Sequence, residues 1–242
     1  MSRLYTFAAP VRFYALSERA MPWLWAATLL LGAAGLYLGL VVAPTDATQG
    51  EVYRILFLHV PAAWLSMLLY LAMAFWAVVG WAFKARMGGV LARAIAPTGA
   101  LFTLLALVTG SLWGQPTWGT WWVWDARLTS ELILLFLYLG FMGLVNAIDE
   151  PARADAAGAL LALVGAVNVP VIYFSVRWWN TLHQGASISM TAAPRMAEQM
   201  LQALLLCTLA LWAYAFAVVL RRAQAGILAR EAGMAWVKEL SQ

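Results

Sequence analysis

QMLQALLLCTLALWAYAFAVVL, the stretch at residues 199–220, contains no charged side chain. A helix needs about 20 mostly apolar residues to cross the hydrocarbon core of a bilayer, so this stretch is long enough to span a membrane. Five other stretches have the same character, and together they predict an all-α integral membrane protein with six transmembrane helices. The six predicted spans are approximately residues 21–43, 55–83, 90–112, 128–148, 157–176 and 199–220.

The composition of the whole chain agrees with these spans. Of its 242 residues, 64% are hydrophobic and 11% are charged, and the mean hydropathy is +0.79. A soluble domain has roughly 45–50% apolar and about 25% charged residues, so the composition excludes a soluble fold. The connections are too short to hold an ATPase domain, and no GxxxxGK[ST] phosphate loop is present. We therefore predict one transmembrane domain over residues 1–242.

The distribution of basic residues predicts the orientation. Six spans put both termini on one side, and that side holds eleven of the fifteen Lys and Arg residues. Cytoplasmic segments carry an excess of these residues, so we predict that both termini are cytoplasmic. Segments 44–54, 113–127 and 177–198 then face outward. The terminal side has Arg3, Arg12, Arg19, Lys84, Arg86, Arg93, Arg153, Arg221, Arg222, Arg230 and Lys238, and the outer side has Arg54, Arg127, Arg177 and Arg195.

The second outer segment is rich in tryptophan. Five of the chain's fourteen tryptophans fall within twelve residues, interleaved with Gly114, Pro116 and Gly119. Tryptophan is favoured at membrane interfaces, so a simple aromatic belt is one interpretation. A belt needs only one or two indoles at each helix end, whereas five in one loop favour a rigid wall for a flat apolar ligand. We expect that wall within loop 113–129, and its tryptophans are Trp113, Trp118, Trp121, Trp122 and Trp124.

Asp125 and Arg127 lie where this loop meets the fourth span. We expect Asp125 or Thr129 to cap the helix, with Glu131 favoured in the first turn by the helix dipole. Arg127 has two possible uses, which are a salt bridge to Asp125 and a bidentate contact with a ligand carboxylate. The sequence leaves both uses open.

The chain has two histidines, His59 at the outer end of the second span and His183 in the last outer segment. A histidine in a membrane protein is often a hydrogen-bonded core residue, but two on one side beside an aromatic wall favour metal binding. Zinc or copper normally takes three or four protein ligands. Haem iron needs two axial ligands, because the porphyrin supplies the other four. These residues therefore fit haem better than a bare metal.

Three arginines on the outer side are candidates for neutralising the two haem propionates. The alternative is that each simply extends its charged end to the membrane interface. The three are Arg54, Arg127 and Arg177.

The segment Trp118-Gly-Thr-Trp-Trp-Val-Trp-Asp125-Ala-Arg-Leu-Thr129 resembles the signature of the haem-handling proteins that are named for their Trp-Trp-Asp domain. The size, the six spans and the segments 54–64 and 178–185 are similar to the CcmC family of haem exporters in cytochrome c maturation. The resemblance covers nearly the whole chain. Gly185 stands where some relatives have proline, and we expect little consequence.

The resemblance implies a function and a set of partners. CcmC proteins lie in the bacterial inner membrane and bind b-type, non-covalent haem at the periplasmic face, with one axial histidine on each side of the Trp-Trp-Asp loop. Those positions match His59 and His183. The family presents haem to the chaperone CcmE and works with the small membrane protein CcmD, and CcmA with CcmB later releases the loaded chaperone. We expect a platform that orients haem rather than an enzyme, within a lipid bilayer and with no nucleic-acid partner.

Two other functions remain open from the sequence. A permease would move haem or another solute through the bundle, and such proteins usually place ionisable residues or broken helices at mid-membrane depth. The spans are nearly free of charge, and their main interruptions are Asn146, Asn168 and Pro170, where we expect a kink. A b-type cytochrome anchor would commonly ligate haem between helices inside the membrane, whereas both histidines here are predicted near one interface.

Overall fold

The computed structural model describes residues 9–183, 185, 188, 194 and 196–240. Six of its helical segments are long and apolar enough to cross a membrane. Within the described residues the chain forms helices and short connections, with one isolated β-bridge between Asp46 and Gly50. The prediction of an all-α protein with six membrane-spanning helices is confirmed. Arg3, Arg195 and Gln242 lie outside the described residues.

The helices have the following bounds. The first span is α2 (Pro10–Tyr37), which continues as a π-helical turn (Leu38–Val42), and a 3₁₀ turn (Glu51–Ile55) precedes the second span. The other helices are α3 (Leu56–Ala82), α4 (Arg86–Trp118), α5 (Ala126–Ala147), α6 (Pro151–Gly165), α7 (Asn168–Trp178), α8 (Glu198–Arg230) and the short α9 (Ala235–Glu239).

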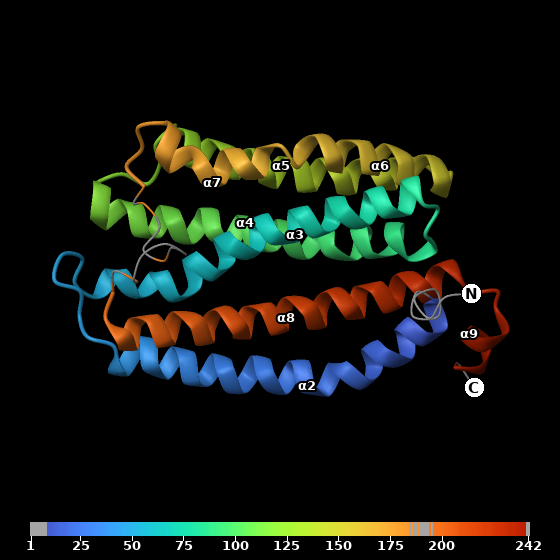
Figure 1. Cartoon of the computed structure of the whole chain (residues 1–242), viewed down its shortest axis with the longest axis horizontal. Helices are drawn as coiled ribbons and strands as arrows, with labels where there is room; N and C mark the ends of the chain where they lie inside the picture. The colour runs from blue at the N-terminus through green and yellow to red at the C-terminus, as the bar shows by residue number, and fades with distance from the viewer. Residues whose placement is uncertain (1–8, 184, 186–187, 189–193, 195, 241–242) are drawn as a thin grey trace.

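The spans run alternately up and down, and they form three groups (Figure 1). Helices α2 and α8 pack together along one edge, and α5 packs with α6 and α7 along the opposite edge. Helices α3 and α4 lie between these groups and pack extensively on each other. We call the end of the bundle where α3 begins and α4 ends the histidine end. The first and last described residues of the chain both lie at the other end of the bundle, which we call the opposite end (Figure 1).

More than half of the predicted tryptophan loop, 113–129, is helical. Helix α4 extends six residues beyond the predicted limit at 112, so the chain between α4 and α5 is only 119–125. The helix ends at Trp118 because Gly119 adopts a left-handed conformation (φ +77°) and its N–H bonds to the Gln115 carbonyl. Trp113 and Trp118 therefore have fixed positions on a rigid helix, whereas Trp121, Trp122 and Trp124 belong to the connection.

The fifth span is broken rather than continuous. Helix α6 ends at Gly165 and α7 begins at Asn168. Pro170 has no N–H to donate to the carbonyl of Ala166, and the Asn168 side chain donates to the Ser130 carbonyl of α5 at 2.8 Å. The predicted interruption is present, but it lies just before the proline. Helix α8 likewise extends ten residues beyond the predicted limit of the sixth span at 220.

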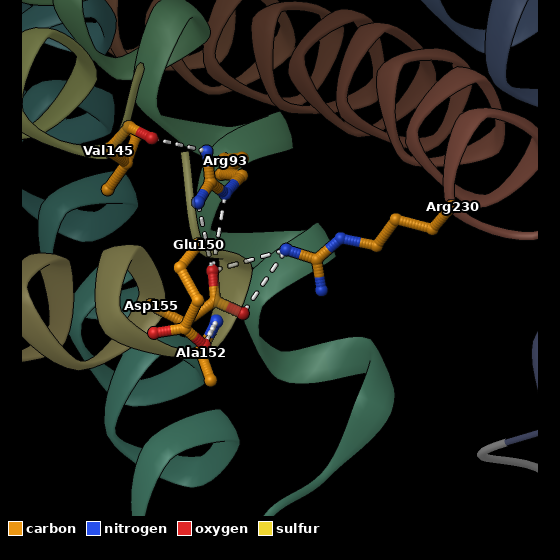
Figure 2. Close-up of polar contacts among 6 residues, drawn as sticks. All are labelled: Arg93, Val145, Glu150, Ala152, Asp155 and Arg230. Carbon is orange, nitrogen blue, oxygen red and sulfur yellow. Dashed lines mark hydrogen bonds and ion pairs between the residues drawn. The ribbon is translucent and has the colours of Figure 1, made fainter. Parts of the chain in front are cut away.

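A carboxylate ties the helices together at the opposite end. Asp155 of α6 accepts hydrogen bonds from Arg93 of α4 and Arg230 of α8, with N···O distances of 3.1 Å for both ion pairs (Figure 2). Arg93 also donates to the Val145 carbonyl at the end of α5. A Cβ at Gly89 would lie 2.4 Å from the Asp155 carboxylate, so only glycine allows this approach. The cluster fixes the helix spacing far from the histidines.

Candidate functional site

His59 lies one turn inside α3 and is held by a hydroxyl of α4. It is buried, and its Nδ1 is 3.0 Å from the Thr109 Oγ1. The Thr109 hydroxyl donates its one proton to the Leu105 carbonyl, at 2.6 Å. Its oxygen is therefore the acceptor, and His59 donates through Nδ1–H. The lone pair of the imidazole is then on Nε2, which is the atom that remains to bind a ligand.

His183 lies beyond α7 and faces His59. The two ring centroids are 6.3 Å apart, with an angle of 37° between the planes. The backbone N–H of His183 donates to the Thr181 hydroxyl oxygen, and that hydroxyl in turn donates to the Asp125 carboxylate. Asp125 also accepts a hydrogen bond from the Leu128 N–H and so caps α5. It is one of the two residues that were predicted for that role. One carboxylate thus positions both the start of α5 and the His183 segment.

Two tryptophans lie against the histidine pair. Trp113 makes an edge contact with His59 at 5.6 Å between centroids, and its Nε1 donates to the Gln49 side chain. The ring centroids of Trp118 and His183 are 6.1 Å apart. Both indoles come from the last turns of α4. Together with the imidazoles they form a rigid aromatic enclosure at the histidine end.

Two adjoining pockets open beside these rings. The first has a volume of about 700 Å³, and the second, on the side of α7 and α8, has about 1460 Å³. The two pockets share five lining residues, which are His59, Ala63, Trp113, Arg127 and His183.

Arg127 and Glu131 bring ionisable side chains into this apolar space. They lie one turn apart on α5, and both line the first pocket. Arg127 donates to the Ile172 carbonyl of α7 at 2.7 Å, and Glu131 accepts from the Ser66 hydroxyl of α3 at 2.6 Å. Glu131 is 7% exposed. The sequence predicted it only as a favourable charge near the helix start, but the structure adds it to the site.

Several predicted site residues lie elsewhere. Arg54 bonds to Glu51 and to the carbonyls of Gly39 and Ala43, so it caps the end of the first span. Arg177 lines only the second of the two pockets. Trp121, Trp122 and Trp124 line neither pocket, and the exposed fractions of Trp121 and Trp124 are 57% and 78%.

Residues 3–238 match the family CcmC, described as heme exporter protein C. The chain belongs to this family. A heme exporter protein C from Bradyrhizobium diazoefficiens is 50% identical over 207 residues, which is 86% of this chain and 78% of the relative. One from Haemophilus influenzae is 43% identical over 244 residues, which is 99% of this chain and 97% of the relative. A putative cytochrome c biosynthesis ccmC-like mitochondrial protein from Marchantia polymorpha is 51% identical over 159 residues, with 66% and 67% covered. The resemblance to CcmC proteins noted in the sequence is confirmed.

Proposed function

We propose that this chain binds haem as its cargo, with His59 and His183 as the two axial ligands, and hands it on during cytochrome c maturation. The facing pair of imidazoles carries this proposal. Metal–imidazole bonds are about 2.0 Å long, which puts the two ligating nitrogens about 4 Å apart. Each nitrogen is about 1 Å from its ring centre, so the centroids would be about 6 Å apart. The 6.3 Å separation supports a single iron between the rings.

Haem suits the surroundings better than a bare ion does. Among the described residues no group of three His, Cys, Asp or Glu side chains is placed to hold a metal ion. A porphyrin brings four ligands of its own, and its flat apolar faces match the indoles of Trp113 and Trp118. The names of the relatives, heme exporter protein C, support the same cargo.

The propionates would lie near the arginines of the pockets. Arg127 lines both pockets and Arg177 lines the second, so each is a candidate partner for a carboxylate. Arg54 already bonds to Glu51 and to two backbone carbonyls. We therefore give Arg54 a structural role and assign the propionates to Arg127 and Arg177.

The charge distribution supports a periplasmic location for the site. Among the described residues, the histidine end has three Lys and Arg residues and the opposite end has ten. An excess of basic residues marks the cytoplasmic side. We therefore propose a protein of the bacterial inner membrane with cytoplasmic termini and a haem site that faces the periplasm.

Delivery would take place through the exposed tryptophans of the connection. Trp121 and Trp124 lie outside both pockets and are largely exposed, and exposed aromatic side chains are the typical anchors of protein interfaces. We propose that they contact the periplasmic haem chaperone CcmE, with CcmD, CcmA and CcmB as the other partners of the complex. The chain offers ligands and orientation to the haem, and the chaperone supplies the group that reacts with it.

Absorption spectra of the purified protein test the haem assignment. We expect a six-coordinate, bis-imidazole spectrum that is lost in both His59→Ala and His183→Ala. Trp118→Ala should lower haem retention, whereas Trp124→Ala should retain haem and lower its transfer to CcmE. A protein without haem, or one whose spectrum is unchanged by both histidine substitutions, would contradict the proposal.

A further inference from the structure

The second pocket is a groove that leads away from the histidines along α3. On α3 it is lined by Leu56, Val60, Trp64 and Met67, whose spacing of four, four and three residues places them on one face of the helix. Met67 lies eight residues beyond His59, which is about 12 Å along the helix axis. The groove therefore extends from the level of the histidines well into the membrane-spanning part of the bundle.

The walls of the groove come from helices on opposite edges of the bundle. Tyr173, Val176 and Arg177 line it from α7, and Leu204 lines it from α8. Helix α7 packs mainly on α5, whereas α8 packs mainly on α2 and α4 (Figure 1). Tyr173 is 54% exposed, so the groove reaches the outer surface of the bundle. In a membrane, lipid chains surround that surface.

The charged and imidazole side chains of the groove are confined to the histidine end, where Leu56 and Met196 also line it. Arg127, Arg177 and the two histidines lie at the histidine end of the groove, and Trp64, Met67 and Leu204 line its deeper part. Haem dissolved in a bilayer has the same polarity, because its propionates stay at the headgroup level while its ring lies among the acyl chains. A molecule in that orientation can enter sideways without exposing its ring to water or moving its carboxylates into hydrocarbon.

We propose that this groove is a lateral entry route by which haem passes from the bilayer to the histidine pair. The inference rests on the proposed function, since the histidine site is where the route ends. Arg127 and the two histidines line both the groove and the first pocket, so haem that moves along the groove arrives directly at its ligands. The propionates would stay near Arg177 and Arg127 during this movement.

A removable plug in the groove tests the route. The variant Tyr173→Cys, made in a Cys207→Ala background to remove the native thiol, is labelled with a benzyl methanethiosulfonate and reconstituted in phosphatidylcholine vesicles. Haem is added to the vesicles, and the growth of the bis-imidazole spectrum is followed with time. Leu205→Cys is the matched control, because Leu205 is 46% exposed on α8 but does not line the groove.

We expect the adduct at position 173 to slow haem uptake at least about tenfold, equivalent to about 1.4 kcal/mol in the barrier to entry, with the final haem level unchanged. Removal of the benzyl group by a phosphine reductant should restore the rate, and the adduct at position 205 should have no effect. An unchanged rate of haem uptake, with the adduct verified by mass spectrometry, would overturn the route. A lowered final haem level would also overturn it, because Tyr173 would then belong to the site where haem stays bound. If the unlabelled protein also acquires no haem spectrum, the proposed function itself fails and the route fails with it.

Discussion

Replacing Thr109 with valine tests whether the hydroxyl of α4 prepares His59 for its ligand. Valine keeps the shape of threonine and removes the acceptor that lies 3.0 Å from His59 Nδ1. In the haem-free Thr109→Val protein, the His59 imidazole is free to turn towards other polar groups of the pocket. Coordination through Nε2 would return the ring to its original position and leave the Nδ1–H without its Thr109 acceptor, so the cost appears as weaker haem binding.

The size of this effect follows from the burial of His59. The residue is 9% exposed, and an unsatisfied buried donor costs about 1–3 kcal/mol. Since about 1.4 kcal/mol corresponds to a tenfold change in affinity, we expect haem binding to weaken by roughly five- to 150-fold. Loss of a hydrogen bond to a metal-binding histidine typically weakens metal binding by about 10–100-fold, so the two estimates agree.

Haem titration of the purified protein measures this change, and Thr103→Val is the matched control. Thr103 is a fully buried residue of the same helix, and its hydroxyl donates to the Gly99 carbonyl four residues earlier, as Thr109 donates to Leu105. Both variants lose that bond, but only Thr109→Val affects His59. Thr109→Ser should restore affinity. Equal haem affinity in Thr109→Val and Thr103→Val would refute the role of the hydroxyl.

Three further predictions concern the second histidine, the close packing at His59 and the opposite end. Thr181→Ala should lower haem loading in a spectral titration with little change in melting temperature, since Asp125 still caps α5; a normal titration would exclude the Asp125–Thr181–His183 link. Gly110→Ala should displace the His59 ring and change the haem spectrum, because the added Cβ would be 3.0 Å from His59 Cε1. Gly143→Ala is the control and should leave the spectrum unchanged, because its Cβ would meet nothing within 4 Å. Asp155→Asn should destabilise the protein by about 1–3 kcal/mol, because it weakens the contacts to both Arg93 and Arg230, and it should leave haem affinity unchanged. Scanning fluorimetry measures the melting temperature of this variant, with Asp149→Asn at an exposed position as the control. Equal melting temperatures of the two variants would contradict this role of Asp155.

The sequence was a good guide to the membrane-spanning fold because that fold depends on local properties. A stretch of about 20 apolar residues must span the bilayer as a helix whatever its neighbours are, and all six spans were predicted. The helix ends were less predictable. The apolar stretch predicted a span that ends near 112, but helix α4 continues until Gly119 provides a left-handed cap. The composition of the segment indicated an interface, and only the backbone conformation located it.

The parts of the site that the sequence missed depend on contacts between helices. Thr109 has no local feature that marks it, and its role is visible only because α3 places His59 next to it. Thr181 likewise gains a role from its contact with Asp125. Glu131 did carry a signal, since an acidic residue four positions after Arg127 in an apolar span is by default a candidate functional residue. The helix-dipole explanation was sufficient for its position but not for its burial.

The two proposed ligands are supported in different ways, and this difference bears on how haem is released. His59 belongs to a long helix, and its ring is fixed by a hydroxyl of the neighbouring helix. His183 lies beyond the end of α7, and its backbone is tied through Thr181 to Asp125 in the connection between α4 and α5. That same connection carries the exposed Trp121 and Trp124, where the acceptor is proposed to dock. If a docked acceptor displaced this connection, Asp125 and the His183 segment would move with it, whereas His59 would keep its place on α3. If His59 and His183 hold the haem as proposed, the less constrained His183 would be the first ligand to let go, and His59 would hold the haem until the acceptor takes it.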